Sequence, residues 1–98
     1  MATKAYRGRQ QIIAEMLNII NASDAKGATR TSIMYKAFLS HAQLKEYLSF
    51  LLENGLIDEV SQQFKSRAGH EKFVYKITER GIRLMQISKE MENIVGLD

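Results

Sequence analysis

The sequence contains no cysteine, and this absence excludes several classes of protein at once. Without cysteine there can be no disulfide scaffold, no thiolate zinc site, no iron–sulfur cluster and no catalytic thiol. Long hydrophobic runs are also missing. Even the apolar stretch 47–52 has a serine inside it and falls far short of the roughly 20 residues that cross a bilayer. The first residues show no apolar signal region, so we expect a cytoplasmic protein without a membrane span.

Residues suited to catalysis or metal binding are sparse. The histidines, His41 and His70, each lack a second ligand at a recognised spacing, and no cysteine can complete a zinc set. There is no glycine-rich phosphate loop, no nucleophile elbow and no His-Glu-x-x-His helix. Carboxylates are scattered, and spacing alone does not assign any two of them as an acid/base pair. We therefore expect neither an enzyme nor a metal or cofactor site.

What the chain does contain is typical of one folded domain. It has 98 residues, of which 45% are hydrophobic and 26% charged, enough for a single core and too few for two. We expect one domain over residues 1–98, with a flexible basic arm at 1–8. The formal net charge is +3, with positive charge toward both ends and a net acidic segment at 31–60. This distribution favours an anionic partner without requiring one.

Hydrophobic periodicity predicts three helices in the first half of the chain. Apolar residues at three- and four-residue steps predict a first helix over 8–21. Thr31 or Ser32 can cap a short second helix, because their hydroxyls accept amide hydrogens of a first turn. Ser40 can cap a third helix in the same way, and Gly55 ends it. The short connection between the second and third helices predicts a tight corner.

The second half of the chain predicts a hairpin followed by a helix. Apolar residues alternate at period two over 56–64 and again over 72–77, as in paired strands. The segment 65–70 between them contains a glycine and basic residues, which is typical of a projecting hairpin loop. Thr78 can cap a last helix over 78–95. The predicted fold is therefore mainly α-helical with a small β-hairpin.

The aromatic residues raise the possibility of base stacking, but most lie at helix or strand spacings that place them in the core. We expect only Phe50 and Phe64 to be exposed. The remaining aromatic side chains in these elements, which include Tyr35, Phe38, Tyr47, Phe73 and Tyr75, are predicted to pack inside the domain.

The order of these elements and several short motifs resemble a known family. The motifs are Thr31-Ser32-Ile33-Met34-Tyr35, Leu39-Ser40 with Gln43-Leu44, Tyr47-Leu48-x-x-Leu51-x-x-x-Gly55-Leu56-Ile57, and Tyr75-x-Ile77-Thr78-x-x-Gly81. Over about Gln10 to Met85 the chain resembles the archaeal winged helix-turn-helix DNA-binding regulators, including the small dimeric chromatin-associated proteins of hyperthermophilic archaea. The resemblance implies a winged helix-turn-helix fold, DNA binding, a transcriptional or architectural role, and a homodimer.

In such a fold the second helix of the helix-turn-helix pair enters the major groove. The candidate reading helix is then 40–54, and its candidate DNA-binding residues are Ser40, His41, Gln43 and Lys45. The Gln43 amide can donate and accept at once, which matches the adenine edge, whereas Lys45 and Ser40 suit guanine or phosphate.

Phosphate contacts are expected from two other places, because phosphate neutralisation dominates nucleic-acid affinity. The first is the wing over 64–72, where Lys65, Arg67 and Lys72 are the leading candidates. The second is the start of the second helix, where free amides and the helix dipole favour an anion; its candidates are Arg30, Thr31, Ser32 and Lys36. Lys4, Arg7 and Arg9 fit equally an arm along the duplex and a solubilising tail.

The last helix carries more apolar surface than a small domain needs. Leu84, Ile87, Met91 and Ile94 step by three, four and three residues, a heptad-like seam through which two chains can meet. The alternative is that the helix folds back on its own domain. A dimer would present two reading helices to half-sites about 34 Å apart.

A second function is compatible with the same residues. Glu46 and Glu53 lie on the outer half of the candidate reading helix, where carboxylates repel phosphates. A winged-helix module that binds proteins instead of DNA would account for them. The basic wing favours DNA.

Overall fold

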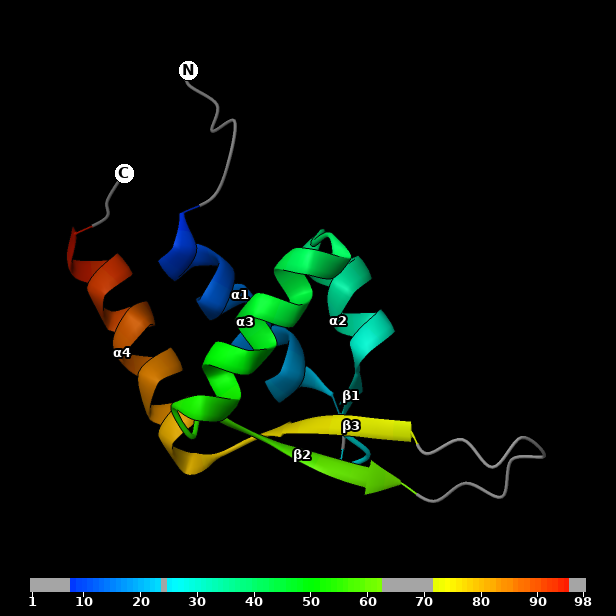
Figure 1. Ribbon diagram of the computed structural model, residues 1–98. Helices are drawn as coiled ribbons and strands as arrows, with labels where there is room; N and C mark the ends of the chain where they lie inside the picture. Colours follow the sequence, from blue (N-terminus) through cyan, green and yellow to red (C-terminus); the bar gives the residue numbers. More distant parts are fainter. Residues whose placement is uncertain (1–7, 24, 63–71, 96–98) are drawn as a thin grey trace.

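The computed structural model describes residues 8–23, 25–62 and 72–95 (Figure 1). The elements in chain order are α1 (Arg9–Ala22), β1 (Ala28–Thr29), α2 (Arg30–Ala37), α3 (His41–Glu53), β2 (Ile57–Gln62), β3 (Lys72–Ile77) and α4 (Glu79–Val95). No helix in these ranges is both long and apolar enough to cross a membrane.

The three strands form one antiparallel sheet in the order β1-β3-β2. The two long strands pair in register from Ile57 opposite Ile77 to Gln62 opposite Lys72, as the period-two pattern predicts. The strand β1 was not expected, because two residues are too few to show a period. It makes β3 the central strand, so side chains of β3 have neighbours on both sides.

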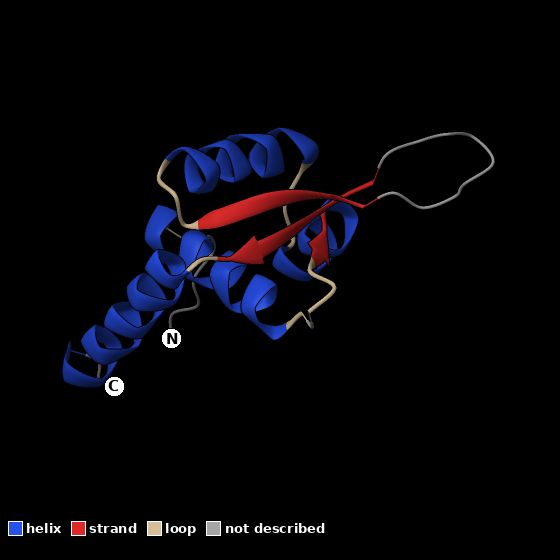
Figure 2. Cartoon of the chain, turned by 90° about the horizontal axis from the view of Figure 1, so that it is seen from below, coloured by secondary structure: helices blue, strands red, loops and turns tan. Residues whose placement is uncertain are grey.

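The core lies where α1, α2 and α3 meet the sheet. Its fully buried side chains include Met16, Leu17, Ile33, Leu51 and Tyr75, each 0% exposed. In α3 the buried residues are those predicted from the helical spacing: Leu44, Tyr47, Leu48 and Leu51. The helix α4 starts beside the sheet, and its last turns extend away from the β2–β3 hairpin, toward the end of the molecule where α1 begins (Figures 1 and 2).

The corner between α2 and α3 is built from two local devices. Phe38 takes a left-handed conformation (φ 55°, ψ 52°), which costs a residue other than glycine about 1–3 kcal/mol. Ser40 then caps α3: its hydroxyl accepts the Gln43 amide at 3.1 Å, and its own amide donates to Gln43 Oε1 at 3.0 Å. This reciprocal capping box fixes where the third helix begins, and it confirms the predicted role of Ser40.

The cap of α2 differs from the prediction. Thr29 Oγ1 accepts the Ser32 amide at 3.1 Å, so Thr29 is the N-cap and neither Thr31 nor Ser32 is. The reason is that β1 leads directly into α2, which begins at Arg30, earlier than the apolar pattern alone indicates.

The end of α3 and the start of α4 are joined through two glycines and one threonine. Gly55 has φ 69°, and the Leu56 amide donates to the Leu51 carbonyl at 2.9 Å, so the predicted glycine stop is confirmed. Thr78 caps α4 by accepting the Gly81 amide at 3.0 Å, and it donates to the Gly55 carbonyl at 2.7 Å. A Cβ at Gly81 would overlap the Leu56 carbonyl.

The expected placement of the aromatic residues is partly wrong. Tyr35 is 69% exposed, Phe38 84% and Phe73 42%, although their spacing predicted the core. The left-handed turn at Phe38 rotates its side chain outward, which periodicity does not show. Phe50, expected to be exposed, packs partly against the core, and Phe64 lies outside the described residues. The mainly helical winged helix-turn-helix architecture itself is confirmed.

Candidate nucleic-acid interface

The outer face of α3 is open to solvent along its length. Ser40, His41, Gln43 and Lys45 are all exposed, because the opposite side of the same helix fills the core. The carboxamide of Gln43 is partly engaged, since its oxygen accepts the Ser40 amide in the capping box. Its NH₂ group is the part that the cap leaves to a ligand. Donation by Gln43 therefore needs no change in the cap, and Oε1 keeps a second lone pair with which it can accept another hydrogen bond.

The predicted wing contacts fall largely outside the described residues. Lys65 and Arg67 lie in the undescribed segment 63–71, and of Lys72 the structure describes the backbone, at the start of β3. The paired strands β2 and β3 do place the two ends of this segment together, as a hairpin requires.

The start of α2 presents two of its predicted anion-binding side chains directly to solvent. Arg30 and Thr31 are exposed, and Lys36 is exposed in the last turn of the same helix. Ser32 is half-buried, and its amide is already bound by the Thr29 hydroxyl. One of the amides that we expected to attract an anion is therefore occupied, and the charge of Arg30 becomes the main feature of this helix end.

Arg30 belongs to a three-residue chain of hydrogen bonds that the sequence did not indicate. Its Nε donates to the Tyr75 hydroxyl oxygen at 3.1 Å, and the Tyr75 hydroxyl donates to Glu59 Oε2 at 2.6 Å. Tyr75 lies in the central strand, directly opposite Ala28 of β1 and Glu59 of β2. The fold thus brings together residues that are 45 and 16 positions apart in the sequence.

The environment of Tyr75 keeps its hydroxyl protonated. Burial, reinforced by the hydrogen bond to the Glu59 carboxylate, raises the pKa of Tyr75 above its ordinary value of 10.0, while Arg30 opposes this shift. A protonated hydroxyl can donate to Glu59 and accept from Arg30 at the same time.

A second contact that sequence reasoning missed joins the first turn of α1 to α3. The Arg9 guanidinium lies 4.9 Å from the Phe50 ring centre and 5.3 Å from that of Tyr47. Its Nη1 is 3.4 Å from Glu46 Oε2. Arg9 therefore lies in α1 and contacts α3 through cation–π and ionic interactions, whereas Lys4 and Arg7 lie outside the described residues.

The Arg9 contact changes the charge of the candidate reading helix. Glu46 was expected to repel phosphates, but it faces the positive charge of Arg9. Both side chains are at least half exposed (50% for Arg9 and 62% for Glu46), so the pair adds little to stability. Its main effect is to offset one of the negative charges on the outer half of α3.

The seam predicted on α4 divides into a packed part and an exposed part. Leu84 packs against the core and Met85 is buried. Farther along, Ile87 is 48% exposed, Met91 59% and Ile94 79%. The first turns of α4 therefore pack on the domain's own core, and the stripe beyond them is largely exposed.

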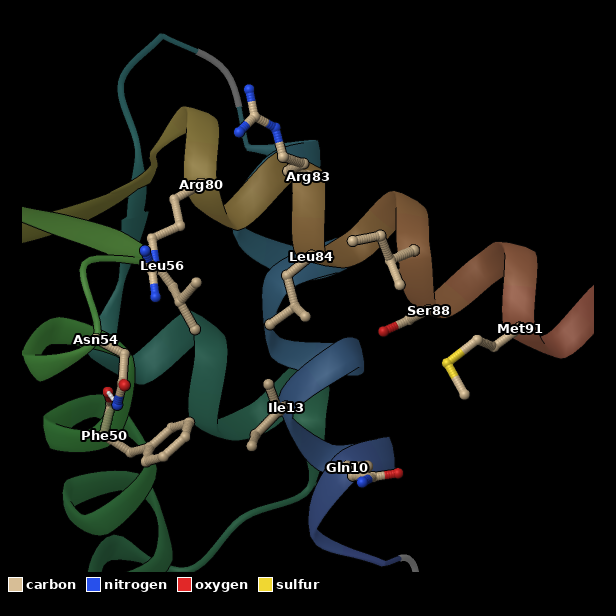
Figure 3. A pocket seen from close by; sticks show the side chains of 11 residues that line it. Gln10, Ile13, Phe50, Asn54, Leu56, Arg80, Arg83, Leu84, Ser88 and Met91 are labelled. Carbon is tan, nitrogen blue, oxygen red and sulfur yellow. Dashed lines mark hydrogen bonds between the residues drawn. The ribbon is translucent and has the colours of Figure 1, made fainter.

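A groove runs beside this exposed stripe. It has a volume of about 530 Å³ and lies between α1, the end of α3 and α4. Figure 3 shows Ile13 of α1, Phe50 of α3 and Leu84 of α4 pointing into it, together with Leu56, which directly precedes β2, and Arg80 at one end. In the described ranges, no three histidine, aspartate or glutamate side chains are grouped so that they could hold a metal ion.

Comparison with known proteins relates the whole arrangement to one family. The profile of the family described as winged helix-turn-helix matches residues 6–95. No curated protein matches the chain significantly.

Three solved proteins have a similar fold. They are a PadR family transcription regulator from Clostridium difficile (TM-score 0.72, 18% identity, 86% of this chain and 88% of that one), Sso10a-2, a DNA-binding protein from Sulfolobus solfataricus (0.69, 21%, 90% and 81%), and MepR from S. aureus in a DNA complex (0.69, 17%, 85% and 64%). The chain thus spans less than two thirds of MepR. At these identities the likeness concerns the fold.

Proposed function

This chain belongs to the winged helix-turn-helix family, and from that premise we propose that it binds double-stranded DNA with a sequence preference. The resemblance to winged-helix DNA-binding regulators noted from the sequence is confirmed at the level of family and fold. We propose that the protein acts as a transcriptional regulator or chromatin-associated protein in the cytoplasm, on the nucleoid. Helix α3 enters the major groove, and the wing over 64–72 binds phosphates.

One observation carries the proposal: α3 buries one side completely and presents the other to solvent. The buried side, which includes Leu51 at 0% and Leu48 at 2% exposure, holds the helix rigidly on the core. The exposed side offers the Gln43 amide and the Lys45 ammonium, groups that bind base edges and phosphates. A rigid helix with free polar groups can be inserted into a groove without refolding.

The charge distribution around α3 supports the same conclusion. Arg9 offsets Glu46, which removes part of the repulsion between the outer face of α3 and phosphates. Arg30 and Lys36 are exposed on the neighbouring helix α2. Lys65 and Arg67 of the wing complete the set of cations that we assign to phosphate binding.

We also propose that two copies associate through α4. The exposed stripe of Ile87, Met91 and Ile94 would lose contact with water in a helix-to-helix contact, at about 25 cal/mol per Å² of apolar surface. The last turns of α4 extend away from the β2–β3 hairpin (Figure 1), so a dimer formed there leaves both hairpins accessible. Two α3 helices would then address half-sites about one DNA turn, or ~34 Å, apart.

The test of DNA binding is a titration of labelled duplexes of several sequences at low and moderate salt. We expect affinity to fall steeply with salt, and Arg67→Ala to reduce the slope of log affinity against log salt by about one. We also expect measurable differences between duplex sequences. Absence of binding at low salt would reject the proposal, and equal affinity for all sequences would leave an architectural protein without sequence preference.

A protein-binding module remains the second candidate, favoured by one observation. Tyr35 and Phe38 expose large aromatic side chains beside the α2–α3 corner, and exposed aromatics are enriched where proteins meet. Recovery of a protein partner after nuclease treatment, together with no duplex binding, would favour this function over DNA binding.

A further inference from the structure

We propose that Tyr75 and Glu59 are positioning residues that hold the Arg30 guanidinium in the orientation in which it binds a DNA phosphate. The inference rests on the proposed DNA-binding function and deepens it. Arg30 is the residue that would touch the phosphate, and the other two act through it.

The sheet fixes this arrangement through the register of its strands. Tyr75 is in the central strand, with Glu59 directly opposite on β2 and Ala28 directly opposite on β1. Arg30 follows Ala28 by two residues and begins α2. The Tyr75 ring is fully buried, so its hydroxyl has a fixed position at the edge of the core. Arg30 is exposed, so that its guanidinium reaches solvent from a fixed anchor.

The hydrogen bonds have a direction that suits this role. The Tyr75 hydroxyl carries one proton, and it donates that proton to Glu59 Oε2 at 2.6 Å, a short charge-assisted bond. With the proton committed to Glu59, the lone pairs of the oxygen are left to accept from Arg30 Nε at 3.1 Å. Glu59 therefore acts as the residue that makes Tyr75 an acceptor.

The contact between Arg30 and Tyr75 leaves the terminal nitrogens of the guanidinium to bind DNA. The contact with Tyr75 uses Nε, whereas a phosphate is recognised by the fork of terminal nitrogens. An exposed arginine normally loses many rotamers when it is fixed on a ligand, and this loss lowers affinity. An arginine that is already held at Nε loses fewer of them.

The proposal makes a prediction opposite to that of simple electrostatics. Glu59 is exposed and negatively charged, so removing its charge should strengthen binding to a polyanion if charge alone mattered. If Glu59 orients Tyr75 and through it Arg30, Glu59→Ala weakens binding despite the gain in net positive charge. Asp58 is the matched control, because it is the exposed neighbouring carboxylate on the same strand and pairs opposite Lys76 instead of Tyr75.

The experiment is a duplex titration over a series of salt concentrations with the full-length chain. We expect Tyr75→Phe, which removes only the hydroxyl, to lower affinity about threefold to tenfold, the range of one hydrogen bond. It should also reduce the salt slope by up to about one. In an Arg30→Gln background the same change should have no further effect on affinity or slope. Tyr35→Phe, which removes an exposed hydroxyl from α2, should leave both unchanged.

Two outcomes overturn the inference while the proposed function survives. The first is wild-type DNA binding that Arg30→Gln weakens and Tyr75→Phe does not. The second is Glu59→Ala that strengthens binding as much as Asp58→Ala does.

Glu59→Gln keeps an oxygen acceptor and should restore most of the affinity that Glu59→Ala loses. If the wild-type chain binds no duplex at low salt, it is the proposed function that fails. Thermal unfolding of each variant shows whether it is folded at the titration temperature. If Tyr75→Phe unfolds, the test rests on Glu59→Ala, because the Glu59 side chain is exposed and its removal leaves the core unchanged.

Discussion

The helices α3 and α4 carry similar apolar stripes, but the two stripes differ in how far they are buried. In α3 the stripe at 44, 47, 48 and 51 is buried along the helix. In α4 the stripe at 84, 87, 91 and 94 is packed only at its first residue, and exposure rises to 79% at Ile94. A helical period therefore shows that a face is apolar and does not show what covers it. We assign the uncovered stripe on α4 to the proposed contact between two copies, and the uncovered polar face of α3 to the proposed contact with DNA.

The largest expected effect is a difference in the free energy of unfolding between a substitution in the α3 stripe and one in the α4 stripe. Leu51→Ala should lower the free energy of unfolding by about 2–5 kcal/mol, because Leu51 is 0% exposed and its loss leaves a cavity. Met91→Ala, at 59% exposure, should change the stability of the dilute protein by about 0.5 kcal/mol or less. Chemical denaturation at low protein concentration measures both. Comparable losses from the two variants would show that Met91 is packed within its own chain.

The next effect concerns association of two copies. Ile87→Glu combined with Met91→Glu should weaken the dimer about a hundredfold or more, because charged side chains would be buried without partners. The matched control is Gln86→Glu with Asn93→Asp, which adds the same charge at exposed positions of α4 outside the stripe. Sedimentation velocity over a concentration series measures the dissociation constants. A wild-type chain that stays monomeric, or a control that dissociates as easily, would remove the basis for a dimer through α4.

A smaller effect tests the ionic contact on the polar side of α3. Arg9→Ala exposes the charge of Glu46 and should lower DNA affinity about twofold to threefold at low salt. Glu46→Gln should raise affinity more in the Arg9→Ala background than in the wild type. If the two changes are simply additive in the titration, Arg9 does not offset Glu46.

The smallest expected effect is the pH dependence that Tyr75 gives to the free energy of unfolding. Tyr75 lies in the same core as the α3 stripe. Its pKa is raised above 10.0 by burial and by Glu59, so the folded state holds the proton more tightly than the unfolded state does. Its contribution to stability is therefore complete below pH 10 and is lost as the pH rises through the folded pKa. The free energy of unfolding of wild type minus that of Tyr75→Phe should be constant at neutral pH and fall above pH 10. A constant difference up to pH 11 would contradict the assigned environment.

The parts of the fold that could be predicted are those that depend on neighbouring residues. Ser40, Gly55 and Thr78 were assigned correctly because a cap or a left-handed turn involves groups within a few positions. The cap of α2 was misassigned because Thr29 belongs to a two-residue strand, and that strand exists only through its pairing with β3. Phe38 was placed in the core because its spacing is helical, whereas the chain turns at that residue.

The candidate site likewise has features that local sequence predicts and features that depend on packing between distant residues. The exposed residues of α3 could be chosen from the sequence, because a buried stripe implies an opposite face. The contacts of Arg9 with α3 and of Arg30 with Tyr75 join residues 37 and 45 positions apart. Neither pair leaves a periodic signal, because each depends on how the helices and the sheet pack together.

The most direct test of the account uses the absence of cysteine, which makes any introduced thiol unique. Ala42→Cys on the exposed face of α3 and Met91→Cys on the exposed stripe of α4 can each be labelled with a thiol-reactive photocrosslinker in the presence of duplex DNA. We predict that the label at position 42 crosslinks to DNA and that the label at position 91 crosslinks to a second copy of the chain. A label at 42 that captures no DNA while DNA is bound, or DNA captured from 91 instead, would contradict the assignment of the two helices.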